Sequence, residues 1–164
     1  MNINILCNKG IELDNNTILL GGYISDVLNI IEAEDIIDDC YYFFESNLSI
    51  TVEDNRISYI EISNDDNYDL NVFIDDIDVF SVERNELINY LTEKNGEDLI
   101  HEVGTLSAKN IGISVDEGLS QADIDELIED AKNEGNIDEM MDSIKGDIKR
   151  MEHISCICLF NETK

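Results

Sequence analysis

Basic residues are scarce in this sequence, which has 10 Lys and Arg against 38 Asp and Glu and a formal net charge of −28 over 164 residues. A surface of this charge repels phosphates at long range, so direct binding to DNA, RNA or anionic lipid is disfavoured. A basic protein is the natural partner. A solvated acidic surface can also serve solubility alone. Self-repulsion costs folding stability, however, which favours a function that uses the charge.

Proline and tryptophan are absent, whereas isoleucine and asparagine are abundant. This composition is typical of an A+T-rich genome, a bias that would also enrich lysine. The shortage of basic residues is therefore a separate feature of the chain. Hydrophobic residues make up 43% of the sequence, which is enough to bury a core. With no internal repeat and no low-complexity linker, we expect one α+β domain over residues 1–164.

Long hydrophobic runs are also missing, since no apolar segment approaches the ~20 residues that a membrane-spanning helix requires. The segment Met1–Asn8 is a short apolar alternation without a basic start, so it does not have the pattern of a signal peptide. We therefore expect a cytoplasmic protein with no membrane association. Its large charge favours a monomer when it is free of its partner.

Histidine is limited to His101 and His153, and neither stands in a motif that pairs it with a nucleophile. Gly21–Gly22 lacks the lysine and hydroxyl of a phosphate-binding loop. Carboxylates are so numerous that no pair stands out as an acid–base couple. The sequence thus predicts a protein that is not an enzyme and binds no cofactor. Carboxylate catalysis with bound Mg²⁺ or Ca²⁺ is the enzymatic alternative.

The four cysteines, Cys7, Cys40, Cys156 and Cys158, show neither a CxxC motif nor zinc-ligand spacing. Cys156 and Cys158 are two residues apart, which on a strand turns both side chains to the same face. A metal held by this pair would need two more ligands, and His153 is the only candidate nearby in the sequence. We therefore expect reduced, structural cysteines and no metal site.

Residues 1–80 are predicted to be rich in strands. Asn2–Cys7 alternates in the manner of a first strand, and Ser25 precedes a short helix. Tyr41–Val52 and Ile57–Ile62 form a candidate hairpin around the tight turn Asp54–Asn55. The sheet then continues through residues 70–80, with a break or bulge at Asp75–Asp76.

Residues 81–153 are predicted to be mainly helical. Ser81 precedes one helix that ends near Asn95–Gly96. Ser120 and Asp123 form an acidic capping box, and an apolar stripe at helical spacing follows it. A second stripe begins after Gly135, so the two helices form a hairpin. Residues 154–160, apolar on both faces, predict a closing strand inside the sheet. We expect a mostly antiparallel sheet with the helical hairpin packed on it.

The acidic residues are concentrated in two stretches. Residues 61–102 hold thirteen acids against two bases, and residues 111–143 hold eleven against Lys132 alone. In the first stretch, Asp65, Asn67 and Asp69 have the spacing of a calcium-binding EF-hand loop. Leu70 stands where the turn of that loop needs glycine, so the sequence does not predict an EF-hand. Carboxylates around aromatic anchors suit a basic protein surface. The predicted partner-binding residues are Asp65, Asp66, Tyr68, Asp69, Asp75, Asp76 and Asp78.

The simpler interpretation of the first stretch is that its aspartates are turn residues. For residues 116–142 the corresponding interpretation is the hydrated face of an amphipathic helix pair. Both interpretations remain open from the sequence.

The order of features resembles that of small bacterial immunity proteins. The segments that carry the resemblance are ILLGGYISDVLNII, YYFFESNLSITVEDNRISYIEIS, LNVFIDDIDVFS, RNELINYL and NIGISVDEGLSQADIDELIEDAKNEG. These proteins are the partners of polymorphic toxins, including those of contact-dependent growth inhibition. The resemblance implies a stoichiometric inhibitor that covers the active or substrate-binding surface of a cognate toxin domain, often a basic nuclease. Such families share no fixed set of functional residues.

The alternative is a nucleic-acid mimic, whose carboxylates imitate phosphates. Such a protein would inhibit many unrelated DNA- or RNA-binding proteins, whereas an immunity protein is selective for one toxin.

Overall fold

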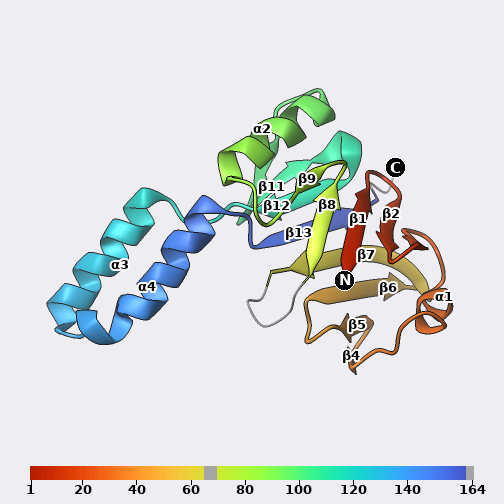
Figure 1. Cartoon of the computed structure of the whole chain (residues 1–164), viewed down its shortest axis with the longest axis horizontal. Coiled ribbons are helices and arrows are strands. Elements are labelled where there is room, and N and C mark those ends of the chain that lie inside the picture. Colours follow the sequence, from red (N-terminus) through yellow and green to blue (C-terminus); the bar gives the residue numbers. More distant parts are fainter. Residues whose placement is uncertain (65–69, 162–164) are drawn as a thin grey trace.

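The strands form two sheets that face each other in the computed structural model, which describes residues 1–64 and 70–161 (Figure 1). The small sheet consists of β1 (Asn2–Leu6), β2 (Gly10–Leu13), β3 (Asn16–Leu19), β8 (Asn71–Ile74) and β9 (Ile77–Asp78). Its strand order is β3-β2-β1-β8-β9. Strand β1 pairs in parallel with β8, and the other pairs of this sheet are antiparallel.

The large sheet is antiparallel and has eight strands. They are β4 (Asp35–Ile37), β5 (Cys40–Phe43), β6 (Leu48–Glu53), β7 (Arg56–Ser63), β10 (Ile100–Glu102), β11 (Thr105–Ala108), β12 (Ile113–Asp116) and β13 (Cys156–Phe160). Their order is β10-β11-β12-β13-β7-β6-β5-β4. The hairpin predicted around Asp54–Asn55 is confirmed as β6–β7, and both turn residues have positive φ, as tight hairpin turns require. Its predicted first arm, Tyr41–Val52, is not one strand, because the chain turns back between β5 and β6 and these two strands pair with each other.

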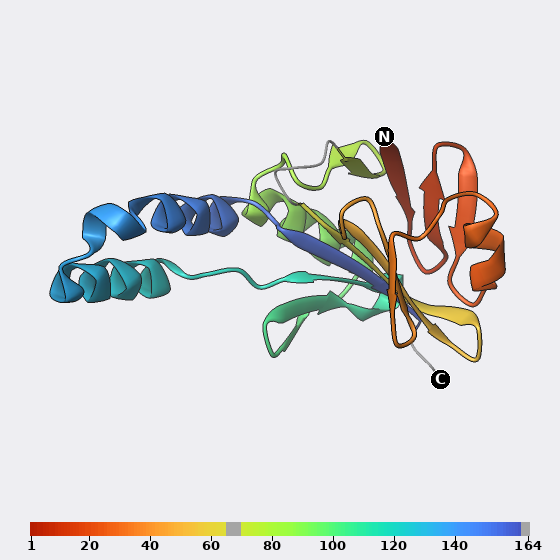
Figure 2. The ribbon, with the colours of Figure 1, turned by 90° about the horizontal axis from the view of Figure 1, so that it is seen from below.

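Within the described residues, five helical segments join these strands. They are α1 (Ile24–Leu28), α2 (Arg84–Asn95), the 3₁₀ turn η1 (Lys109–Ile111), α3 (Gln121–Glu134) and α4 (Ile137–Glu152). The predicted start of α1 after Ser25 is wrong, since the helix begins at Ile24 and its N-cap is Tyr23. Helix α2 lies on the same side of the large sheet as the small sheet does (Figure 2). Its Leu87 and Leu91 are fully buried in the common core. The opposite face of the large sheet, here called the outer face, is turned away from both.

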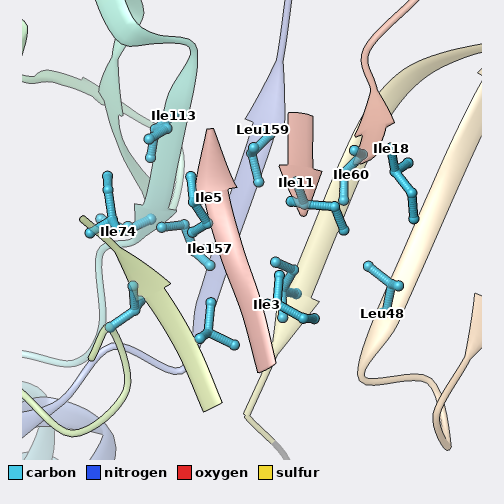
Figure 3. Close-up of a cluster of buried hydrophobic side chains, with 14 of the residues drawn as sticks. Ile3, Ile5, Ile11, Ile18, Leu48, Ile60, Ile74, Ile113, Ile157 and Leu159 are labelled. Carbon is cyan, nitrogen blue, oxygen red and sulfur yellow. The ribbon is translucent and has the colours of Figure 1, made fainter. Parts of the chain in front are cut away.

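The core fills the space between the two sheets. Alternate residues of each strand point inward, so Ile3 and Ile5 of the small sheet meet Ile157 and Leu159 of the large sheet (Figure 3). All four are 4% exposed or less. The prediction of a mostly antiparallel fold is confirmed, with two facing sheets where the sequence suggested one.

Strand β13 lies inside the large sheet, between β12 and β7, as predicted. Its inner side chains Ile157 and Leu159 belong to the core. The prediction that β13 is covered on both sides is met only in part, because on the outer face Cys158 is buried while Cys156 and Phe160 are half-buried.

The helical hairpin α3–α4 is confirmed, including the capping box in which Ser120 accepts from the Asp123 backbone N–H. Gly135 ends α3 with φ 73°, a left-handed conformation that favours glycine. The hairpin extends away from both sheets instead of packing on one (Figures 1 and 2). It can do so because Ile124, Ala131 and Ile144 bury one another between the two helices, each 4% exposed or less.

Candidate functional site

The first predicted acidic stretch divides into two parts. Asp65, Asp66, Tyr68 and Asp69 lie outside the described residues. Asp75, Asp76 and Asp78 lie at the β8–β9 turn, on the side of the molecule that carries α2.

Two of these three aspartates have hydrogen bonds within the fold, Asp75 to α2 and Asp78 to the segment that precedes it. Asp75 has φ 54° and accepts hydrogen bonds from the Tyr90 hydroxyl and the Lys94 ammonium of α2. Asp78 accepts from the backbone N–H groups of Phe80 and Ser81 at 3.2 and 3.3 Å. Asp76 is exposed beside them. Asp75 and Asp78 therefore fit the simpler interpretation of the first acidic stretch, in which its aspartates are turn residues.

The hydrogen bond from Lys94 lowers the pKa of Asp75, with a further contribution from Tyr90. A lowered pKa means that the ionised carboxylate stabilises the folded state above the unfolded pKa of ~3.9 and loses this effect as pH falls through the folded pKa. We expect Asp75→Asn to lower the Tm at neutral pH, with the gap to wild type narrowing as the pH falls below the unfolded pKa and through the lowered pKa of Asp75. Thermal unfolding followed by circular dichroism between about pH 2 and pH 7 measures this gap, with Asp76→Asn as the exposed neighbouring control. A gap that stays constant with pH would contradict this expectation.

The second acidic stretch is the α3–α4 hairpin, and its base is fixed by one buried arginine. Arg84, at the start of α2, is 8% exposed. Its guanidinium donates to the backbone oxygen and the carboxylate of Asp116, at 2.7 and 2.8 Å. It also donates to the carbonyls of Met151 and His153, at 3.1 and 2.9 Å. One side chain thus joins the strand that enters the hairpin to the segment that leaves it.

Two further contacts complete this base. The other carboxylate oxygen of Asp116 accepts from the N–H groups of Ser155 and Cys156, both at 2.9 Å. Gly118, with φ 73°, lies against the guanidinium, and a Cβ there would stand 2.5 Å from the Arg84 Cζ. Charge-assisted hydrogen bonds therefore hold together the two segments that enter and leave the hairpin.

The hairpin surface combines carboxylates with partly exposed apolar side chains. Its residues 121–152 contain eleven acids and four bases. Along the buried seam, Leu127, Ile128 and Ile148 are half-buried, and Met140 and Met141 are each 38% exposed. Partly exposed apolar side chains surrounded by predominantly negative charge are the composition of a protein-binding surface whose electrostatic field steers its partner.

The outer face of the large sheet carries the other notable group. Cys156 and Cys158 of β13 have their sulfurs 3.7 Å apart, and Glu61 of β7 lies opposite Cys158 in the strand register. The Cys156 hydrogen bond lowers the pKa of Cys158, and the same contact together with burial raises the pKa of Cys156. Burial, with a hydrogen bond to Cys158, raises the pKa of Tyr59 beside them. Glu61 was missed from the sequence, where it lies far from both cysteines.

The two histidines have structural contacts. His101 Nδ1 lies 3.2 Å from a Glu117 carboxylate oxygen on the exposed surface. His153 Nδ1 lies 2.9 Å from the Val82 carbonyl oxygen. His153, the ligand candidate suggested by the sequence, is therefore directed to the α2 side of the hairpin base.

No helix within residues 1–64 and 70–161 combines the length and the apolar character needed to cross a membrane. Comparisons of the chain with models of protein families, with curated proteins and with solved structures give no match.

Proposed function

We propose that this chain is an immunity protein that binds and neutralises a cognate bacterial toxin domain, most simply a basic nuclease, by covering its active or substrate-binding surface. The observation that carries the proposal is the acidic hairpin, which extends beyond the two sheets with an apolar strip at its seam (Figure 1). The net charge of −28 supports a basic partner.

The two parts of the hairpin surface have different roles in this proposal. The carboxylates attract a basic surface from a distance and raise the association rate. The apolar strip supplies area that can be desolvated on contact, where binding energy is concentrated. Met140 and Met141 suit this role because their unbranched side chains adapt to the shape of a partner.

The direct test is co-expression with the toxin domain encoded immediately upstream. Cells that make both proteins are expected to grow, whereas cells that make the toxin domain alone are expected to die. Equal killing with and without this chain would refute the proposed function. A pull-down from lysate distinguishes the nucleic-acid mimic, which would recover several unrelated nucleic-acid-binding proteins instead of one toxin.

Charge reversal tests whether the hairpin is the interface. We expect the triple change Glu126→Lys, Glu129→Lys and Asp130→Lys to slow association with the toxin domain by about tenfold or more and to weaken its salt dependence. These three side chains are exposed on α3. Stopped-flow fluorescence at several salt concentrations gives both quantities.

The matched control reverses three exposed acids at the other end of the molecule, Asp26, Glu32 and Glu53. It changes the net charge by the same amount, so it separates a local contact from the overall field. Equal slowing by both triple variants would mean that the hairpin is not the interface. The remaining candidates would then include the stretch that contains Asp75 and Asp76.

A further inference from the structure

The outer face of the large sheet brings two thiols and a carboxylate together in a group that the acidic surface does not explain. Cys156 and Cys158 project from the same face of β13 because they are two residues apart on one strand. Glu61 is aligned with Cys158 on the neighbouring strand β7. The ligand atoms of all three residues lie within 4.8 Å of one another.

We propose that Glu61, Cys156 and Cys158 form a binding site for a thiophilic divalent cation, with Zn²⁺ as the best fit. Two thiolates at Zn–S distances of ~2.3 Å and a tetrahedral angle stand about 3.8 Å apart. The two sulfurs here are 3.7 Å apart. The Cys158 sulfur and the Glu61 Oε2 are 3.9 Å apart, against about 3.6 Å for a tetrahedral S–Zn–O pair.

The strand geometry favours a metal over a disulfide at this pair. Residues two apart on an extended strand have Cα atoms ~6.6–6.8 Å apart, which is the upper limit for a disulfide. Closing the S–S bond would also require the sulfurs to approach from 3.7 Å to about 2.05 Å. A shared cation bonds both sulfurs with almost no change of backbone.

The surroundings hold the three ligands in position. Strand β13 is hydrogen-bonded on both sides, and the backbone N–H of Cys156 also donates to Asp116. Cys156 and Glu61 are half-buried rather than enclosed, which leaves a fourth coordination position on the solvent side. Three protein ligands with one open position is the arrangement of zinc sites that bind water or an incoming group.

This site is independent of the proposed toxin binding, because none of its three ligands belongs to the α3–α4 hairpin. It also goes against the expectation from the sequence that the cysteines hold no metal. That expectation counted only ligands near the cysteines along the chain, whereas the register of β7 and β13 supplies Glu61.

Metal titration of the reduced protein tests the site. The expected result is one Zn²⁺ per chain, and a Co²⁺ complex with the sulfur-to-metal charge-transfer absorption of thiolate ligands. Cys156→Ser or Cys158→Ser should weaken Zn²⁺ binding by about 100-fold or more. Glu61→Gln should weaken it by about 10–100-fold, since even outer-shell changes have effects of that size.

The matched controls are Cys7→Ser and Cys40→Ser, which remove the two thiols outside the cluster and should leave the affinity unchanged. Surface carboxylates of this acidic protein could bind cations weakly, and such binding would survive the loss of both Cys156 and Cys158. Survival of this kind, or a Co²⁺ complex without the thiolate absorption, would overturn the proposal. If the serine variants do not fold, the Co²⁺ spectrum of the wild-type protein and the Zn²⁺ affinity of Glu61→Gln test the proposal.

Discussion

Replacing Arg84 by methionine is expected to lower the free energy of unfolding by about 3–5 kcal/mol. The change leaves the Asp116 carboxylate and the carbonyls of Met151 and His153 without their shared donor in a site where Arg84 is 8% exposed. Urea unfolding followed by circular dichroism measures the loss. Hydrogen exchange of α3 and α4 shows in addition whether the hairpin opens before the sheets do.

The matched control is Arg56→Met. Arg56 is exposed, donates to the Gly21 carbonyl and the Tyr23 hydroxyl, and stacks on the Tyr23 ring at 4.3 Å. Its loss is expected to cost about 1 kcal/mol or less, because water replaces its contacts. Similar losses in the two variants would mean that the guanidinium does not hold the base of the hairpin.

Truncating Leu159 to alanine is expected to cost about 2–5 kcal/mol of unfolding free energy. Leu159 is fully buried, and the register places it between Ile60 of β7 and Ile113 of β12. The cost has two sources, the lost burial of the methyl groups and the cavity that remains between strands that cannot collapse onto it. Equilibrium denaturation gives the value.

Leu19→Ala is the corresponding surface control, since Leu19 is 47% exposed on the edge strand β3. Its expected effect is within about 0.5 kcal/mol. If Leu159→Ala were as mild as this control, the centre of the large sheet would be packed more loosely than its burial indicates.

Local patterns predicted the elements whose signals lie within a few residues of one another. The β6–β7 turn at Asp54–Asn55, the Ser120–Asp123 capping box and the helix end at Gly135 are of this kind. The position of β13 inside the sheet also followed from the sequence, because residues 154–160 lack the alternation of an edge strand.

Pairings between distant segments could not be predicted. The parallel pairing of β1 with β8 creates the second sheet, yet spacing along the chain gives no sign of it. The short strands β2 and β3, on either side of the Asp14–Asn15 turn, were not predicted from the sequence. The apolar stripes of α3 and α4 are compatible with packing on a sheet or on each other, and only the structure distinguishes these arrangements.

The candidate sites also combine features that the local sequence predicts with features that depend on contacts between distant segments. The acidity of both stretches can be counted directly from the sequence. The direction in which the hairpin extends cannot be predicted in this way. The contact of Glu61 with Cys158 depends on the register of two strands far apart in sequence, so no motif could reveal it. Asp75 and Asp78 are predicted partner-binding residues, and each also has contacts within the fold that spacing along the chain does not show.

The place of β13 between β12 and β7 also determines the order in which a growing chain can complete its large sheet. Until Cys156–Phe160 has been synthesised, strands β4–β7 and β10–β12 can form only two separate partial sheets. The facing edges, β7 and β12, then present unpaired N–H and carbonyl groups to other nascent chains. Glu61 places negative charge on the β7 edge, whereas the Asp116 carboxylate on the β12 edge is paired with Arg84. During synthesis the Glu61 carboxylate is therefore expected to oppose pairing of the exposed β7 edge with other nascent chains.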